Sequence, residues 1–269
     1  METVRVPDAY DLRGIKPGKK VWLESNEVWQ ERINRTCAKY PNHFVAKLEQ
    51  RGPLAILGYG PSLLNTWTEI VNCEAIWTVS GAHDFLVRQS VIPTYHTDMD
   101  YREHKTRFIK EFQPETRYIM SSMCHDNYLS RIPVLELFHI ERPGISYPIN
   151  EKAYHLYWDV IQQATCIAYD EGYRDIHLFG VDLCMSSNQQ AAGEHFGDDK
   201  ETIRVTCNGW YFVTAYEMIE SIVRWPQLLE DHPGLQITVH GEGLLKEYLA
   251  LPTDIEPTIE LKDIENANN

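Results

Sequence analysis

One stretch of ten residues, Leu54 to Leu63, constrains the fold of this chain more than any other. An apolar run of strand length ends at a Gly-x-Gly turn, and Pro61-Ser62 then begins a predicted helix. Strand, glycine turn and helix start in this order are typical of the first βα corner of nucleotide-binding α/β domains, where backbone N–H groups and the helix dipole attract a phosphate. The stretch therefore predicts a nucleotide site at Gly58, Tyr59, Gly60, Pro61 and Ser62. A turn that binds no ligand is the alternative, because neither a full G-x-G-x-x-G motif nor a P-loop lysine is present.

The rest of the chain continues this pattern of short apolar runs separated by segments of helical length. Such alternation predicts a Rossmann-like α/β fold, with a mostly parallel sheet and helices on both faces. The expected strands are Leu54–Leu57, Ala75–Val79, Thr94–Thr97, Tyr118–Ser121, Val134–Phe138, Asp175–Phe179 and Leu235–Val239. The expected helices are Ser62–Val71, Ala82–Gln89, Tyr101–Phe112, Glu151–Glu171 and Gly209–Leu229. Gly172 is the predicted C-terminal cap of the fourth helix.

The predicted organisation is a single main domain with an N-terminal helical extension. Residues 1–50 form the arm and helical extension, residues 51–250 the Rossmann-like nucleotide-binding transferase domain, and residues 251–269 an acidic C-terminal tail. The long polar segment from Asp182 to Asn208 directly follows a predicted strand. Ligands of open α/β sheets bind beyond the carboxyl ends of strands, so we expect a substrate loop or lid there. A surface insertion is the alternative.

Composition and charge exclude several classes of protein. The 269 residues carry a formal net charge of −14, which argues against a chain-wide basic surface for nucleic acid. No apolar run approaches the length of a membrane span, and Met1 to Tyr10 lacks the apolar core of a signal peptide, so a cytoplasmic protein is expected. The cysteines are scattered without C-x-x-C spacing, which predicts neither a zinc site nor a disulfide framework.

The densest polar cluster of the chain lies at residues 96–105, after the third predicted strand. An Asp-x-Asp pair at a strand end is suited to Mg²⁺ or Mn²⁺ that also binds phosphate oxygens, so a divalent metal is predicted at Asp98 and Asp100. Aspartates are also common at strand ends and helix caps without a metal. The neighbouring side chains are predicted to bind substrate, with solvated charges and a packed histidine as the alternatives; they are His96, Arg102, His104 and Lys105.

Two further strand ends supply candidate site residues. Ser80, Gly81 and His83 follow the second strand, where dinucleotide folds carry a ribose-binding residue, and are predicted to line the nucleotide pocket. Asp182 ends the sixth strand, and His195 lies in the polar segment beyond it. Both are candidate catalytic residues that would deprotonate or position an acceptor hydroxyl. The alternatives are a turn aspartate and an exposed loop histidine.

Three motifs together resemble a known family. They are Gly58-Tyr59-Gly60-Pro61-Ser62-Leu63, the strand end Thr97-Asp98-Met99-Asp100, and the segment from Gly172 to Leu183 that contains Gly180-Val181-Asp182. They are similar to motifs of the MptE-like (hydroxymethylpterin diphosphokinase-like) family, including phage-encoded members and motility-associated glycosyltransferases. The first and third motifs also resemble bacterial sialyltransferases.

This resemblance covers about Leu54 to Leu249. It implies the Rossmann-like fold, a nucleotide donor at Gly58 to Ser62, and a metal or substrate role for Asp98 and Asp100. Met99 departs from the leucine that is usual in the family. The late catalytic histidine of the sialyltransferases has no counterpart near Asn208 to Tyr211, so His195 is only a positional substitute.

Together these features predict an enzyme that transfers part of a nucleotide-activated donor. The first hypothesis is a metal-dependent glycosyltransferase that moves a sugar from a nucleotide sugar to an acceptor hydroxyl. The alternatives are an ATP-dependent diphosphokinase acting on a pterin-like hydroxymethyl heterocycle, and a non-catalytic nucleotide-binding module. The acceptor and the oligomeric state stay open, and no membrane partner is expected. A DNA base as acceptor, for a phage-encoded member in the host cytoplasm, gains no support from the acidic charge.

Overall fold

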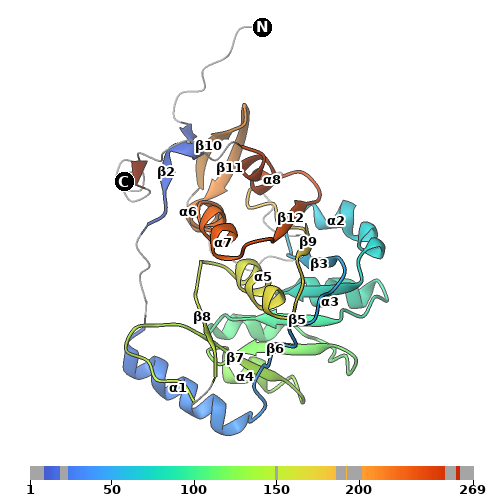
Figure 1. Ribbon diagram of the computed structural model, residues 1–269, viewed down its shortest axis with the longest axis vertical. Helices are drawn as coiled ribbons and strands as arrows, with labels where there is room; N and C mark the ends of the chain where they lie inside the picture. The colour runs from blue at the N-terminus through green and yellow to red at the C-terminus, as the bar shows by residue number, and fades with distance from the viewer. Residues whose placement is uncertain are drawn as a thin grey trace, which may run out of the picture.

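The computed structural model describes residues 9–18, 24–148, 151–185, 192, 202–251 and 259–260. Within these residues a parallel sheet of eight strands forms the centre of the molecule, in the order β12-β9-β3-β4-β5-β6-β7-β8 (Figure 1). The strands are β3 (Leu54–Leu57), β4 (Ala75–Val79), β5 (Tyr95–Asp98), β6 (Arg117–Ser121), β7 (Glu136–Ile140), β8 (Ala153–Tyr154), β9 (Asp175–Phe179) and β12 (Gln236–Val239).

The strand order creates one switch point. From β3 the chain adds β4 to β8 successively on one side, and β9 and β12 then pair on the other side of β3. β3 and β9 are neighbours in the sheet, and the chain therefore turns toward one face after β3 and toward the opposite face after β9. A crevice at the carboxyl ends of such strands is the usual ligand site of open α/β sheets.

Helices cover both faces of this sheet. They are α1 (Asn26–Lys39), α2 (Leu63–Thr66), α3 (Ala82–Arg88), α4 (Asp126–Leu129), α5 (Val160–Asp170), α6 (Tyr216–Ile222), α7 (Trp225–Asp231) and α8 (Leu244–Leu249), with short 3₁₀ helices η1 (Leu12–Gly14), η2 (Trp67–Asn72) and η3 (Glu103–Arg107). Among these described helices none is long and apolar enough to cross a membrane.

Alternation along β3 shows how the two cores are divided. Leu54 and Ile56 belong to the large core that includes residues of α5, α6 and α7, whereas Ala55 and Leu57 belong to the core that includes residues of α2 and α3. All four side chains are fully buried. A strand buried on both faces needs apolar residues at every position, which explains the uninterrupted LAIL sequence.

A small second sheet extends the molecule beside α6. It consists of β1 (Tyr10–Asp11), β10 (Thr202–Cys207) and β11 (Trp210–Ala215), and β10 and β11 form an antiparallel hairpin. The hairpin turn is Asn208-Gly209, and both residues have positive φ. This combination is typical of a type I′ turn, which matches the twist of the two strands. Separately, β2 (Ile15–Lys16) pairs with β13 (Ile259–Glu260).

Each of the seven predicted strands is present in the central sheet, with shifts of at most two residues, whereas its eighth strand, β8, was not predicted. Gly172 also ends α5 as predicted, with φ +104°. The N-terminal helical prediction is confirmed as far as Lys39, where α1 ends. The predicted substrate loop at 182–208 lies largely outside the described residues, but its last part is β10. Most of the predicted tail, 251–269, also lies outside them.

Three helix predictions were wrong in part. The segment 101–112 forms only the short 3₁₀ helix η3, since the Asp100 carboxylate binds the N–H of Arg102 and Ile109 has φ +54°. The helix predicted at 151–171 begins only at Val160, because β8 occupies its start. The first part of the helix predicted at 209–229 is the strand β11, because the Asn-Gly turn folds the chain back to pair with β10.

Candidate functional site

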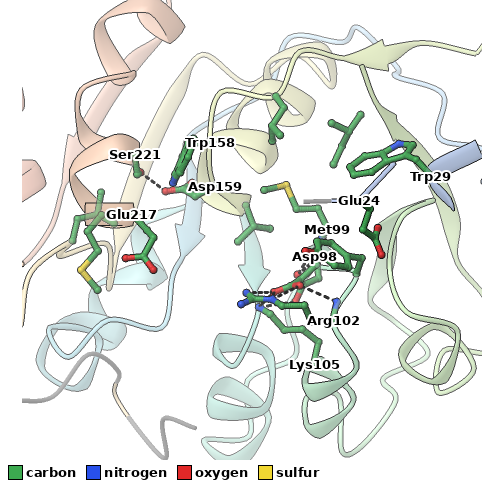
Figure 2. Close-up of a pocket in the computed structure, with 17 residues that line it drawn as sticks. Glu24, Trp29, Asp98, Met99, Arg102, Lys105, Trp158, Asp159, Glu217 and Ser221 are labelled. Atoms are coloured by element: carbon green, nitrogen blue, oxygen red, sulfur yellow. Dashed lines mark hydrogen bonds and ion pairs between the residues drawn. The ribbon is translucent and has the colours of Figure 1, made fainter. Parts of the chain in front are cut away.

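A cavity of about 480 Å³ lies beyond the carboxyl ends of β5 and β7 (Figure 2). The segment from Asp98 to Lys105, which follows β5, forms one part of its lining. The starts of α5 and α6 form another, and Trp29 of α1 and Glu24 lie on the side away from α6. Since open α/β sheets bind ligands at this edge, the cavity is our candidate site.

Asp98 is anchored at the end of β5 with its side chain almost fully buried. Its Oδ1 accepts the backbone N–H groups of Met99 at 2.8 Å and Asp100 at 3.2 Å. Its Oδ2 is held more loosely, since the hydroxyls of Ser80 and Tyr128 lie 3.5 and 3.4 Å away. The backbone therefore fixes the direction of this carboxylate, while Oδ2 lies 3.4–3.5 Å from two hydroxyls and the ammonium of Lys105.

Two cations neutralise the Asp-x-Asp pair. Nζ of Lys105 lies 3.5 Å from Asp98 and 3.8 Å from Asp100, and it donates to the Ser80 hydroxyl at 2.9 Å. Arg102 donates to both oxygens of Asp100, at 2.6 to 3.1 Å. Burial alone would raise the pKa of Asp100, but the bonds from Arg102 and the charge of Lys105 hold it below its usual value. The Lys105 side chain is 13% exposed and that of Arg102 60%, so Arg102 has the greater freedom to turn toward a ligand.

This arrangement does not fit a divalent ion between the two carboxylates. The ammonium of Lys105 already lies between them, the backbone occupies one oxygen of Asp98, and Arg102 occupies both oxygens of Asp100. Mg²⁺ or Mn²⁺ needs several oxygen ligands and would have to displace a nearly buried cation. The positive charges that the site itself offers are therefore Lys105 and Arg102, and metal dependence stays a prediction.

Two tryptophans give the cavity apolar faces. Trp29 is buried on α1, with the guanidinium of Arg142 4.7 Å from its ring centre. Trp158 precedes α5, with the guanidinium of Arg224 5.1 Å from its ring centre. An arginine stacked on an indole is attracted to its π face and helps to hold the ring in place. Flat apolar surfaces of this kind suit a sugar ring or a nucleotide base.

Two carboxylates line the cavity from the side of α5 and α6 (Figure 2). Asp159 caps α5 by accepting the N–H of Gln162 at 2.9 Å, and its other oxygen accepts the hydroxyl of Ser221. Burial raises the pKa of Asp159. Glu217, in the first turn of α6, is exposed. Of these two carboxylates, Glu217 is the one accessible to a ligand, because Asp159 is committed to the helix start.

The predicted nucleotide corner packs against the turn that follows β9. The N–H groups of Gly58 and Gly60 donate to the carbonyls of Phe179 and Gly180, both at 2.8 Å. A Cβ atom at Gly58 or Gly60 would lie only 2.5 or 2.7 Å from the carbonyl oxygen of Gly180. The glycines are thus required by the contact of two turns at the switch point. This corner, including Tyr59 and Pro61, is outside the described lining of the cavity.

Asp182 holds the two turns together. Its carboxylate accepts both the backbone N–H of Ser62, at 2.8 Å, and the hydroxyl of Ser62. Its own carbonyl accepts the N–H of Leu244 at 2.8 Å. The donors of Ser62 that were predicted to bind phosphate are therefore taken by a carboxylate of the chain. Asp182 is buried outside the cavity lining, whereas the next residue, Leu183, contributes to that lining.

The residues after β4 are divided between the site and its support. Ser80 joins the cluster around Lys105 through its hydroxyl. Gly81 lies against the ring of Tyr59, where a Cβ atom would be only 2.5 Å from a ring carbon. The carbonyl of Tyr59 in turn accepts the N–H of Ala192 at 2.8 Å. Ser80 is thus close to the cavity, and Gly81 supports the corner.

The predicted histidines do not contribute to the described lining. His83 is fully buried and its Nε2 lies 2.9 Å from the Tyr118 hydroxyl. His96 is equally buried, with Nδ1 3.0 Å from the Thr78 hydroxyl, and burial holds its pKa well below the usual range. His104 is exposed on η3, and His195 lies outside the described residues. The packed alternative thus describes His96, and His83, for which it was not considered, is packed as well.

Sequence reasoning missed the side of the cavity that α1, α5 and α6 supply. Trp29 was assigned to an extension without a role, and Trp158, Asp159 and Glu217 fell inside predicted helices. One signal was present: Asp159 and Gln162 form a capping box, which marks the start of α5. No local pattern brings α1 and α6 next to the end of β5, because that contact depends on the tertiary arrangement.

Comparison with known proteins now gives the family. The family model described as 6-hydroxymethylpterin diphosphokinase MptE-like matches residues 31–188, which is more than half of the chain and includes β3 to β9. The chain belongs to this family. The match contains Asp98, Asp100, Lys105 and Asp159, but not α6. A comparison with curated protein sequences finds no match.

One solved structure supports the fold. The MAf glycosyltransferase from Magnetospirillum magneticum AMB-1 superposes with a TM-score of 0.64 and 16% identity over 92% of this chain. The chain spans only 42% of that protein. A mammalian sialyltransferase, solved with Gal-beta-1-3GalNAc-ortho-nitrophenol, gives a TM-score of 0.41 and 13% identity over 89% of this chain and 92% of that chain. At these identities the first similarity shows the Rossmann-like fold that was predicted, and nothing finer.

Proposed function

We propose that this chain is a glycosyltransferase that moves a sugar from a nucleotide sugar to an acceptor hydroxyl, with the reaction in the cavity beyond β5. The observation that carries the proposal is the combination of polar groups in the described lining. It holds the carboxylates of Glu24, Asp98, Asp100, Asp159 and Glu217 against the cations of Arg102 and Lys105, together with two tryptophans. Most of these carboxylates already have partners within the chain, and Glu217 is the exposed one that can accept a hydrogen bond from a ligand hydroxyl. A polyhydroxylated ligand therefore suits this lining.

The cations suit the other half of the donor. When the bond between the sugar C1 and the phosphate oxygen breaks, the electron pair stays on the phosphate, and this developing charge needs a positive partner. Arg102 is exposed enough to reach a phosphate while Lys105 stays with the two aspartates. Lys105 then offsets the charge of Asp98 and Asp100, which would otherwise repel the leaving group.

The acceptor oxygen forms the new bond to C1 and loses its proton. Glu217 is our candidate for the group that takes this proton, because it is an exposed carboxylate of the lining. Asp182 is bound to Ser62 outside that lining. In this proposal Asp182 positions the switch point and takes no part in the proton transfer.

The alternative is the diphosphokinase activity that the family name describes. It would bring the polyphosphate of ATP and a hydroxymethyl heterocycle into the same cavity. The local charge disfavours it, because the carboxylates of the lining outnumber its cations and a polyphosphate adds further negative charge. An added divalent metal would reduce this penalty, so metal dependence is measured in the same experiment. The third alternative is a module that binds nucleotide without turnover.

The test is an incubation of the whole chain with ATP and with a panel of nucleotide sugars, with and without a metal chelator. Mass spectrometry identifies the released nucleotide. We expect release of UDP, GDP or CMP, and a loss of about 100-fold in turnover for Arg102→Ala, as for removal of one group that stabilises a developing anion. Lys105→Ala should also lower turnover, because Asp98 and Asp100 would then repel the leaving phosphate. Lys110→Ala, an exposed lysine after η3, is the matched control and should turn over like the unsubstituted chain.

The other outcomes decide against the proposal. Release of AMP from ATP alone identifies the diphosphokinase, and nucleotide binding without any release identifies the non-catalytic module. Full activity of Lys105→Ala would show that the reaction takes place elsewhere. Activity that chelator abolishes and Mg²⁺ or Mn²⁺ restores would show that a metal replaces Lys105 between the aspartates.

A further inference from the structure

A second cluster of reactive side chains lies away from the cavity lining, between the end of α1 and β7. Cys37, His43 and His139 each offer one ligand atom, and these three atoms all lie within 4.8 Å of one another. Cys37 is in the last turns of α1, His43 forms an isolated bridge beside β7, and His139 is on β7 itself. Three separate segments thus bring one thiol and two imidazoles to a single point.

A carboxylate contacts the two histidines of this group, although the set of atoms that lie within 4.8 Å of one another does not include it. Oε2 of Glu151 lies 2.5 Å from Nδ1 of His43 and also contacts Nε2 of His139. Nδ1 of His43 is buried and, among the described residues, has no hydrogen-bond partner, although the carboxylate oxygen is this close. One oxygen thus lies against two imidazole nitrogens and is out of line for a hydrogen bond to one of them. A cation bound by all three atoms would satisfy them.

The second nitrogen of His139 is also bound. Its Nδ1 lies 2.9 Å from the hydroxyl of Ser122, and both residues are buried. A hydrogen bond from Nδ1–H to this hydroxyl leaves the lone pair of Nε2 directed at the cluster. Histidines that bind metals are regularly oriented in this way by a bond to their other nitrogen.

We propose that Cys37, His43, His139 and Glu151 form a structural zinc site. A thiolate, two imidazoles and a carboxylate are the ligands that Zn²⁺ prefers, and four protein ligands give the closed tetrahedral site of a structural zinc. The thiolate and carboxylate also balance its two charges, and the thiol proton goes to solvent on binding. Ligand atoms around zinc lie about 3.3–3.6 Å apart. The ion would therefore draw the atoms of Cys37, His43 and His139 together, and would move the Glu151 oxygen away from Nδ1 of His43, from which it lies 2.5 Å.

The position of the site gives zinc a role in the fold. It would join the C-terminal part of α1 to β7 and to the segment before β8. The same helix carries Trp29 of the cavity lining. Zinc would therefore fix the position of α1 against the sheet, and with it one apolar face of the cavity, without touching the ligand.

The test begins with the purified whole chain, stripped by chelator, reloaded with Zn²⁺ and desalted. We expect one equivalent of zinc by elemental mass spectrometry, and a thiolate-to-metal charge-transfer band with tetrahedral ligand-field bands when Co²⁺ replaces zinc. Cys37→Ser should abolish the charge-transfer band, while Cys73→Ser, a matched and also partly buried cysteine, should keep it. Ser122→Ala should weaken zinc binding by about 10- to 100-fold, as for other residues that orient a metal ligand.

Two results would overturn the proposal. One is a reloaded chain that holds no zinc after desalting, or a cobalt form without the thiolate band; this measurement needs no substitution and so is unaffected by any folding defect of a variant. The other is a Cys37→Ser chain that is folded by circular dichroism and binds zinc as tightly as Cys73→Ser.

Discussion

Gly60 allows the two turns at the switch point to pack closely because it has no side chain. A Cβ at this position would lie 2.7 Å from the carbonyl oxygen of Gly180 and 2.9 Å from a carboxylate oxygen of Asp182. The carbonyl belongs to a turn held by hydrogen bonds on both sides, so it cannot move away cheaply. Gly60→Ala should therefore lower the free energy of unfolding by about 1–3 kcal/mol, as in other overpacked sites. Urea unfolding measures the difference.

The control for this prediction is Gly52→Ala. There the nearest atom to a new Cβ is a carboxylate oxygen of Glu74, at 2.5 Å, and this flexible side chain can turn aside. We expect a smaller loss for Gly52→Ala than for Gly60→Ala. Equal losses would show that the backbone of the Gly180 turn yields as easily as a side chain.

Asp182 makes the free energy of unfolding depend on pH, and this contribution can be measured separately from those of other groups. Burial raises its pKa above the 3.8 of a free aspartate, so the folded chain holds this proton more tightly than the unfolded chain. Between the two pKa values the folded state binds more protons, and stability must fall as the pH rises through that interval. Compared with Asp182→Asn, which does not titrate, the unsubstituted chain should therefore gain stability as the pH falls through the folded pKa toward 3.8.

The measurement is urea unfolding of both chains over a series of pH values. Taking the difference between them cancels the titration of all other groups. A difference that stays constant with pH, or that changes in the opposite direction, would show that the bonds from Ser62 outweigh the burial of Asp182.

At the scale of elements, the start of α5 depends on one residue. Asp159 binds the N–H of Gln162 and the hydroxyl of Ser221, which joins α5 to α6. Asp159→Ala should lower the free energy of unfolding by about 1–2 kcal/mol, the upper part of the range for helix caps. Ser25→Ala, at the cap of α1, should cost only about 0.5 kcal/mol, because that bond is 3.5 Å long and exposed. Thermal unfolding should rank the two variants in this order.

The sheet could be predicted from the sequence because each central strand is buried on both faces. Leu54–Leu57 and Ala75–Val79 are short, apolar and bounded by turn residues, so the local pattern contains the whole signal. The helix prediction for residues 210–215 was wrong because the aromatic residues of this segment fit the apolar stripe of a helix as well as a strand. The Asn208-Gly209 turn, a local signal that was passed over, decides between the two.

Only the part of the candidate site formed by one continuous segment of the chain could be predicted from the sequence. Asp98 and Lys105 lie in one polar run after one strand, so their shared position follows from the strand order. Trp29 and Glu217 reach the same cavity from elements far apart in the chain. The proposed zinc ligands could not be predicted from the sequence either, because Cys37 and His139 come together only when α1 packs beside β7. Spacing in the sequence carries no trace of such contacts.

At the scale of the whole molecule, the switch point and the cavity lie at the same carboxyl edge of the sheet but have different linings. The turns after β3 and β9 bond to each other through Asp182, and Leu183 continues from them into the cavity lining. Ligand binding in the cavity should therefore affect three distant parts of the chain together: α1 around Trp29, residues 98–105, and α6 around Glu217. Binding at the glycine corner would instead affect residues 58–62 and 180–182.

Hydrogen exchange with the preferred nucleotide donor distinguishes the two sites. We expect exchange to slow together in α1, in residues 98–105 and in α6, because one ligand would contact all three. At a donor concentration about 100-fold above Kd, binding should add about 2.7 kcal/mol to the free energy of unfolding, and should raise Tm by roughly 5–10 °C. Lys105→Ala should reduce this rise, whereas Lys110→Ala should keep it. Protection confined to residues 58–62 and 180–182 would place the donor at the glycine corner, and the cavity would then be the site of the acceptor or of no ligand.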